Sequence, residues 1–156
     1  PEQGIKDDPV LIDGDICVNT VLGSSMLISK KLFQELNGFD ENFFLYFSDD
    51  EICKRINKKK ISVIQSFNSK ATHIHGVSKV GSIIKRIFLR EFHYTFDEMY
   101  YYYKQKIEND LISSKKKKLF NYLIKFFLSI IIFKIKKSTF YLARVLAIFK
   151  FYRLNK

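Results

Sequence analysis

The sequence predicts an α/β fold that is followed by a helical C-terminal extension. In the first part of the chain, short segments with helical spacing alternate with short runs rich in Ile and Val, which is typical of α/β domains. Beyond about residue 80 the strand signals stop, and long apolar stretches with frequent lysines follow. We therefore expect an α/β unit at residues 1–80 and a helical extension at residues 81–156.

The first expected helix covers residues 30–36, after a turn of small residues at Gly23-Ser24-Ser25 and an apolar segment. Ser29 is a suitable N-cap because its hydroxyl can accept a hydrogen bond from the first turn. Asn37 and Gly38 tolerate the left-handed backbone that ends many helices. These signals predict a short helix between two turns.

The second expected helix covers residues 51–60, with Ile52 and Ile56 one turn apart on its inner side. Short strands are expected at residues 61–66 and 71–74. Cys53 falls in this helix, where we expect a small core residue. Two cysteines in the chain are too few for a disulfide framework or a zinc site.

Three consecutive carboxylates, Asp49, Asp50 and Glu51, follow an aromatic run at residues 43–47. Packing alone rarely requires this grouping, and carboxylates beside aromatic rings suit a general base in a cleft. A purely structural interpretation is also open. Ser48 and Glu51 have the spacing of a capping box, and acids in a first turn interact favourably with the helix dipole. The two interpretations are compatible.

The chain resembles the family 2 glycosyltransferases, in particular the bacterial rhamnosyltransferase-like branch that builds lipid-linked polysaccharides. The resemblance runs from Gly23 to Ser78. It includes the small-residue segment, the helix, the motif Gly-Phe-Asp-Glu-x-Phe-Phe-x-Tyr at residues 38–46 with the acids behind it, and His-x-x-Gly-x-Ser at residues 73–78. It implies the acceptor-side, C-terminal half of a GT-A fold and an inverting transferase.

The resemblance also implies roles for single residues. Asp49 corresponds to the general base that deprotonates the acceptor hydroxyl, although Asp50 is close enough to leave a one-residue ambiguity. Ser48 stands where the family has Glu, so the acceptor contact of that Glu is in doubt. The remaining residues implied in substrate or acceptor binding are Asp50, Glu51, Arg55, Gly23 and Ser78.

His73 corresponds to a family histidine that binds the divalent metal and the diphosphate of the donor, so Mn²⁺ or Mg²⁺ is the expected cofactor. His75 lies two residues on and projects from the same side of an extended strand, which makes it a weaker metal ligand candidate. We do not expect a separate zinc site, since His93 is the only further histidine and no cysteine cluster accompanies it.

Asp13-Gly14-Asp15 has the form of a metal-binding D-x-D motif. The family places further strands and helices between its D-x-D and the small-residue segment, whereas Gly23 follows Asp15 almost at once. An acidic turn before a strand is the preferred interpretation. We therefore expect the chain to be the C-terminal portion of a larger transferase, inactive without a sugar-nucleotide half.

Charge divides the chain. Residues 1–103 hold 13 Lys and Arg against 14 Asp and Glu, and residues 104–156 hold 14 against 2. The basic part also holds an apolar stretch at residues 119–133, shorter than the roughly 20 residues that span a bilayer. Such segments suit peripheral binding to an anionic membrane, here the cytoplasmic face of the inner membrane. A helical hairpin that covers the catalytic core is the alternative.

Nucleic acid is not an expected partner, because continuous Ile and Phe between the lysines serve no phosphate contact. The function predicted from sequence is transfer of a sugar from a nucleotide-sugar donor to a lipid-linked saccharide. The alternative from another class is a non-catalytic, membrane-associating module with a GT-A-like core.

Overall fold

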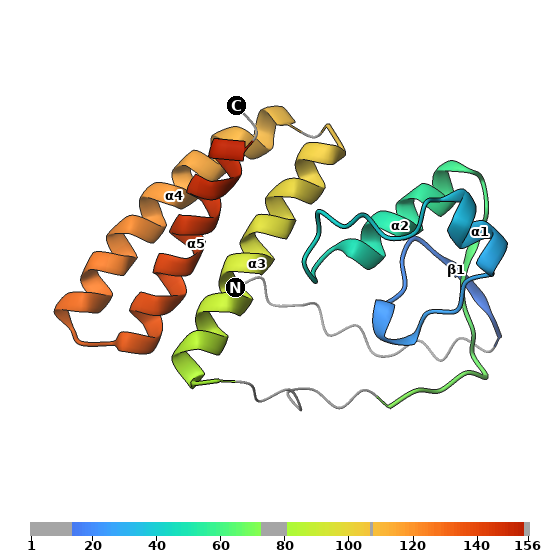
Figure 1. Ribbon diagram of the computed structural model, residues 1–156, viewed down its shortest axis with the longest axis horizontal. Helices are drawn as coiled ribbons and strands as arrows, with labels where there is room; N and C mark the ends of the chain where they lie inside the picture. Colours follow the sequence, from blue (N-terminus) through green and yellow to red (C-terminus); the bar gives the residue numbers. More distant parts are fainter. Residues whose placement is uncertain (1–13, 73–80, 107, 155–156) are drawn as a thin grey trace.

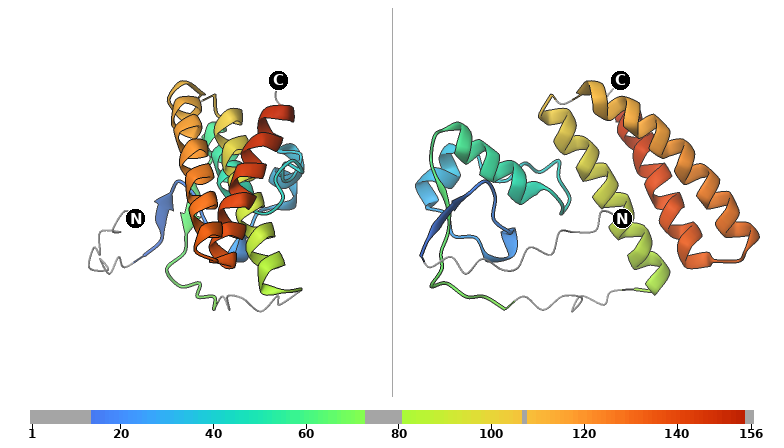
Figure 2. Two further views of the ribbon diagram at one scale, coloured as in Figure 1. Left: turned by 90° about the vertical axis from the view of Figure 1, so that its left-hand side faces the viewer. Right: turned by 180° about the vertical axis from the view of Figure 1, so that it is seen from behind.

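The computed structural model describes residues 14–72, 81–106 and 108–154, with the backbone alone described for residues 108–116. A small mixed part is followed by three long helices, and α3 lies between the two (Figures 1 and 2). The elements are β1 (Ile16–Val18), η1 (Gly23–Ser25), α1 (Lys30–Glu35), α2 (Ser48–Lys58), β2 (Val63–Gln65), α3 (Ile83–Lys104), α4 (Glu108–Ile131) and α5 (Ile135–Leu154).

β1 and β2 form a two-stranded antiparallel sheet in which Cys17 pairs with Ile64. The Asp15 carboxylate closes one end of this sheet, since it accepts hydrogen bonds from Ser66 Oγ (3.0 Å) and from the backbone N–H of Phe67 (2.9 Å). This contact agrees with an acidic turn before a strand, although Asp13 lies outside the described residues. Over the described ranges the structure is mainly helical with this one small sheet, so a complete GT-A fold is not shown.

The helices predicted at residues 30–36 and 51–60 are present as α1 and α2, and α2 begins three residues earlier than predicted. The Leu32 N–H donates to Ser29 Oγ at 3.3 Å, and the helix ends where Asn37 and Gly38 adopt φ values of 58° and 69°. The predicted strand at residues 61–66 is present as β2, whereas residues 71 and 72 are not in a strand and the rest of that segment is not described. The core of this part consists of Leu36, Ile52, Cys53, Ile56 and Val63.

The predicted capping box at the start of α2 is wrong. The helix begins at Ser48, and the residue before it, Phe47, is left-handed at φ 62° and makes no side-chain cap. Ser48 Oγ instead donates to the Leu45 carbonyl (3.4 Å), and the Glu51 carboxylate turns toward Arg55 and Lys104. Other local contacts and the tertiary contact with Lys104 therefore replace the cap.

α5 packs against both α3 and α4, and its small and branched residues form the contact face. The burial of Ile148 and Phe151 against Met99 joins α5 to α3. An ion pair between Arg144 and Glu91 (2.7 Å) fixes the same two helices. None of the helices within the described residues is both long and apolar enough to cross a membrane.

The other side of α3 contacts the loop at residues 40–47. Phe43 packs edge-on against Tyr100, and Phe44 stacks on His93 with ring centroids 3.7 Å apart. Burial lowers the pKa of His93, so its ring is neutral in this stack at pH 7. The domain boundary predicted at residue 80 stays a prediction. α3 contacts both the loop at residues 40–47, before this boundary, and α5, after it.

Candidate functional site

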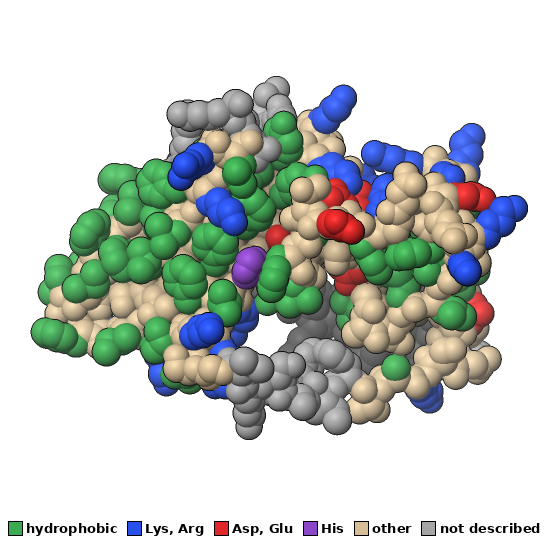
Figure 3. Space-filling model, in the orientation of Figure 1, with side chains coloured by type: hydrophobic (Ala, Val, Ile, Leu, Met, Phe, Trp, Pro, Cys, Tyr) green, Lys and Arg blue, Asp and Glu red, His purple; other side chains and the backbone are tan. Residues whose placement is uncertain are grey.

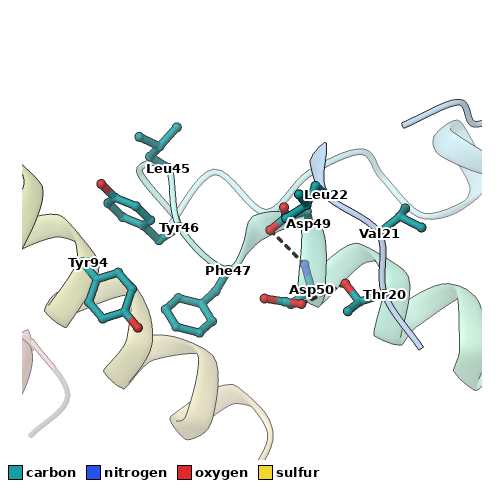
Figure 4. Close-up of a pocket in the computed structure, with 9 residues that line it drawn as sticks. All are labelled: Thr20, Val21, Leu22, Leu45, Tyr46, Phe47, Asp49, Asp50 and Tyr94. Carbon is teal, nitrogen blue, oxygen red and sulfur yellow. Dashed lines mark hydrogen bonds between the residues drawn. The ribbon is translucent and has the colours of Figure 1, made fainter. Parts of the chain in front are cut away.

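A pocket of about 410 Å³ lies where residues 20–22, the end of the aromatic run and α3 meet (Figure 4). One side carries two carboxylates, and the other side carries aromatic rings. The residues that line it are Thr20, Val21, Leu22, Leu45, Tyr46, Phe47, Asp49, Asp50 and Tyr94.

Asp49 lies at the pocket, and its carboxylate is oriented by the neighbouring backbone. The Gly23 N–H donates to Asp49 Oδ2 at 2.9 Å, and the Asp50 N–H donates to Asp49 Oδ1 at 3.1 Å. A Cβ atom at Gly23 would lie 3.3 Å from Asp49 Cβ, so glycine permits this close approach. Each carboxylate oxygen keeps a further lone pair that can accept a substrate proton.

Asp50 lies beside Asp49 in the same pocket, and Thr20 Oγ1 donates to its Oδ1 at 2.8 Å. The structure thus brings both candidate bases together with Gly23, and the one-residue ambiguity stays open. Thr20 was not identified from sequence. A single threonine 30 residues before its partner carries no recognisable signal.

The aromatic side of the pocket combines residues from two segments. The Tyr94 ring on α3 lies 5.2 Å from the Tyr46 ring and 5.5 Å from the Phe47 ring, measured between centroids. Burial raises the pKa of both Tyr46 and Tyr94, which keeps their phenols protonated and able to donate hydrogen bonds. Sequence analysis singled out the aromatic run but not Tyr94, which lies 47 residues after Phe47 in the chain.

Phe47 stands at the junction between the aromatic run and α2. Its φ of 62° is unusual for a bulky residue. The conformation is held by contacts of its ring with Tyr94 and with Tyr101, whose centroid is 5.5 Å away. Backbone strain of this kind concentrates at functional sites, and here it turns the chain so that α2 starts at the pocket.

Glu51 and Arg55, two predicted acceptor-binding residues, do not line the pocket. The Glu51 side chain is 1% exposed and pairs with Arg55 Nη2 at 2.7 Å. Arg55 also donates to the backbone carbonyls of Leu36 and Gly38, which fixes the end of α1 on α2. Both side chains are occupied by contacts within the chain, and their contact with an acceptor stays a prediction.

Lys104 at the end of α3 joins two carboxylates of the first part. Its Nζ lies 2.6 Å from Asp40 Oδ2 and 2.7 Å from Glu51 Oε1, and the Tyr100 hydroxyl donates to Asp40 Oδ2 at 3.1 Å. Burial disfavours the Asp40 carboxylate, but hydrogen bonds from Lys104 and Asn42 outweigh it and hold the pKa of Asp40 at about 2.

This low pKa predicts a stability loss in acid. Because the ordinary pKa is 3.8, the Asp40 carboxylate should add up to about 2 kcal/mol to the free energy of unfolding above pH 4. This contribution should be lost as the pH falls from about 4 to about 2. Asp40→Asn should therefore lower the free energy of unfolding at pH 7, and its difference from wild type should vanish near pH 2. Urea denaturation across this range measures both. Glu35→Gln, which breaks the exposed pair with Lys59, is the matched control and should cost under about 0.5 kcal/mol.

The metal prediction is not tested by the structure. Among residues 14–72, 81–106 and 117–154 no group of three or more His, Cys, Asp or Glu side chains is placed to hold a metal ion. The predicted ligands His73 and His75 lie outside the described residues, as does Ser78.

Residues 12–78 match a family model described as the N-terminal domain of galactosyltransferase. The match supports a glycosyltransferase domain in this part of the chain. The match contains Gly23, Asp49 and Asp50, and it ends before α3 begins. It supports a sugar-transfer role in general, but neither the family 2 branch nor a C-terminal position in the enzyme. No curated protein and no solved structure matches the chain.

Proposed function

We propose that the chain belongs to an inverting family 2 glycosyltransferase that acts in cell-surface polysaccharide synthesis. The donor is a nucleotide-activated sugar and the acceptor a lipid-linked saccharide. The observation that carries the proposal is the pair Asp49 and Asp50 at one pocket, within a glycosyltransferase-type domain, with Gly23 donating to the predicted base.

In the proposed reaction, the Asp49 carboxylate accepts the proton of an acceptor hydroxyl while that oxygen forms a bond to the anomeric carbon of the donor sugar. The bond from this carbon to the nucleotide diphosphate breaks, and the diphosphate leaves with the electron pair. Attack from the opposite side inverts the configuration. We expect the phenols of Tyr46 and Tyr94, which line the pocket, to donate hydrogen bonds to the acceptor sugar.

A transfer assay tests this function in the enzyme that carries the chain. Nucleotide-activated rhamnose and galactose are supplied separately with a lipid-linked saccharide, and the product is analysed for the configuration of the new linkage. The sequence resembles a rhamnosyltransferase-like branch, whereas the matching family model is described as a galactosyltransferase domain, so both donors are tested. An inverted product from either donor supports the proposal. A retained configuration would contradict the inverting mechanism. No transfer from either nucleotide sugar, together with membrane binding, would favour the non-catalytic alternative.

The proposal includes a divalent cation, Mn²⁺ or Mg²⁺, with His73 as a ligand. His73→Ala should raise the Mn²⁺ concentration that half-saturates donor binding by about 10-fold, and His75→Ala should have a much smaller effect. Donor affinity measured over a Mn²⁺ titration distinguishes them. Equal curves for wild type and His73→Ala would remove His73 from the site.

We also propose that α4 and α5 bind the anionic surface of the inner membrane from its cytoplasmic side. The end of the α4–α5 hairpin exposes a cluster of large apolar side chains, and Figure 3 shows hydrophobic side chains spread over this face. We call this cluster the hairpin tip: Phe127, Ile130, Ile131, Ile132, Phe133 and Ile135.

Two features favour a membrane as the occupant of the hairpin tip. Phe133 is 89% exposed and left-handed at φ 50°, a position at which helix ends usually carry glycine, so a bulky apolar residue stands where folding does not favour one. Exposed lysines, including Lys125, Lys134 and Lys136, surround it, and the sequence has no Asp or Glu after Asp110. Apolar insertion with surrounding positive charge fits an anionic lipid surface.

A further inference from the structure

We infer that Asp97 on α3 is a positioning residue for the carboxylates of the pocket. Its side chain is fully buried, and it accepts hydrogen bonds from three consecutive backbone N–H groups. Asp97 Oδ1 accepts from Phe44 (3.2 Å), and Oδ2 accepts from Leu45 (3.0 Å) and Tyr46 (2.9 Å).

This arrangement fixes the loop strongly. Successive N–H groups that point to one side form a concave anion site, and hydrogen bonds to a charged acceptor are about twice as strong as neutral ones. A buried carboxylate is costly unless it is fully hydrogen-bonded, so Asp97 and the loop stabilise each other's conformation. Without Asp97, these three N–H groups would lose their acceptor.

The loop residues that donate to Asp97, Phe44 to Tyr46, directly precede the site. Tyr46 is followed by Phe47, whose left-handed backbone starts α2, and Asp49 is the second residue of that helix. α3 holds the same junction at two further points, through the Tyr101 ring against Phe47 and through Lys104 on Glu51. The orientation of Asp49 toward the pocket thus depends on a helix outside the residues that match the transferase model.

α3 is thus part of the catalytic unit. Asp97 does not line the pocket and touches no reacting atom, so it acts through the loop alone. The part that concerns turnover rests on the proposed transferase function, whereas the part that concerns the loop does not. Hydrogen exchange and turnover, measured on the same variant, therefore show separately whether Asp97 holds the loop and whether the proposed transferase function is correct.

Amide hydrogen exchange of the 156-residue chain tests whether Asp97 holds the loop, and it needs no activity assay. In wild type, the N–H groups of Phe44, Leu45 and Tyr46 should be protected. Asp97→Asn keeps the shape but turns an N–H₂ group toward one of these donors, so their exchange should accelerate about 10- to 100-fold. Unprotected amides at these three positions in the wild-type chain would overturn the inference, whether or not the variant folds.

Glu91→Gln is the matched control, because Glu91 is also a buried carboxylate on α3 but pairs with Arg144 on α5. It should accelerate exchange in α5 and leave the amides of residues 44–46 unchanged. Equal acceleration at residues 44–46 in both variants would show that Asp97 acts only through general stability, which contradicts the inference.

Turnover supplies the second measurement. In the transferase that carries the chain, Asp97→Asn should lower kcat about 10-fold or more, with KM for the donor changed less than 2-fold, because the base is displaced while donor binding is retained. Glu91→Gln should leave kcat within 2-fold of wild type. If Asp49→Asn abolishes transfer but Asp97→Asn does not reduce kcat, the transferase function stands and the positioning role is wrong.

Discussion

Asp49→Asn should reduce turnover by about 10²–10⁴-fold with little change in donor affinity. The substitution keeps the side-chain shape and the Gly23 contact through its oxygen, but it removes the group that accepts the acceptor proton. Initial rates at saturating donor and acceptor, with donor affinity measured separately, give the two quantities.

Asp50→Asn is the matched control, because it makes the same chemical change one residue away and can keep the contact with Thr20 through its amide oxygen. We expect a reduction of less than about 10-fold. A crippled Asp50→Asn enzyme with a nearly normal Asp49→Asn enzyme would move the base by one residue. Normal rates in both variants would contradict the transferase interpretation of this pocket.

The second large effect is expected at the hairpin tip. The double variant Ile132→Asp/Phe133→Asp should weaken binding to vesicles that contain anionic lipid by at least about 10²-fold, since it removes two inserting side chains and adds two negative charges. Sedimentation of the 156-residue chain with vesicles measures the partition. Wild-type binding should also fall steeply with salt, because the Debye length is only about 8 Å at physiological ionic strength.

Leu27→Asp is the matched control, since Leu27 is a fully exposed apolar residue in the other part of the molecule. It should bind vesicles as wild type does. Binding that resists high salt and carbonate would mean integration into the bilayer instead of peripheral attachment. Binding to DNA or RNA without vesicle binding would overturn the membrane proposal.

The sequence determined the elements whose signals lie within a few residues of each other. The Ser29 cap, the stop at Asn37 and Gly38 and the inner face formed by Ile52 and Ile56 all appear as predicted. α3 begins at Ile83, close to residue 81, where the helical extension was predicted to begin. Capping, left-handed turns and helical periodicity are local properties, so neighbouring residues suffice to specify them.

The tertiary structure alone decided how the site is assembled. Ser48 and Glu51 have capping-box spacing, but contacts of Phe47 with α3 and of Glu51 with Lys104 outweigh that local preference. Tyr94 and Asp97 reach the pocket and its loop from about 50 residues further along the chain. Because each such contact depends on how α3 packs, no local pattern specifies it, and the carboxylates were recognisable from sequence while the residues that hold them were not.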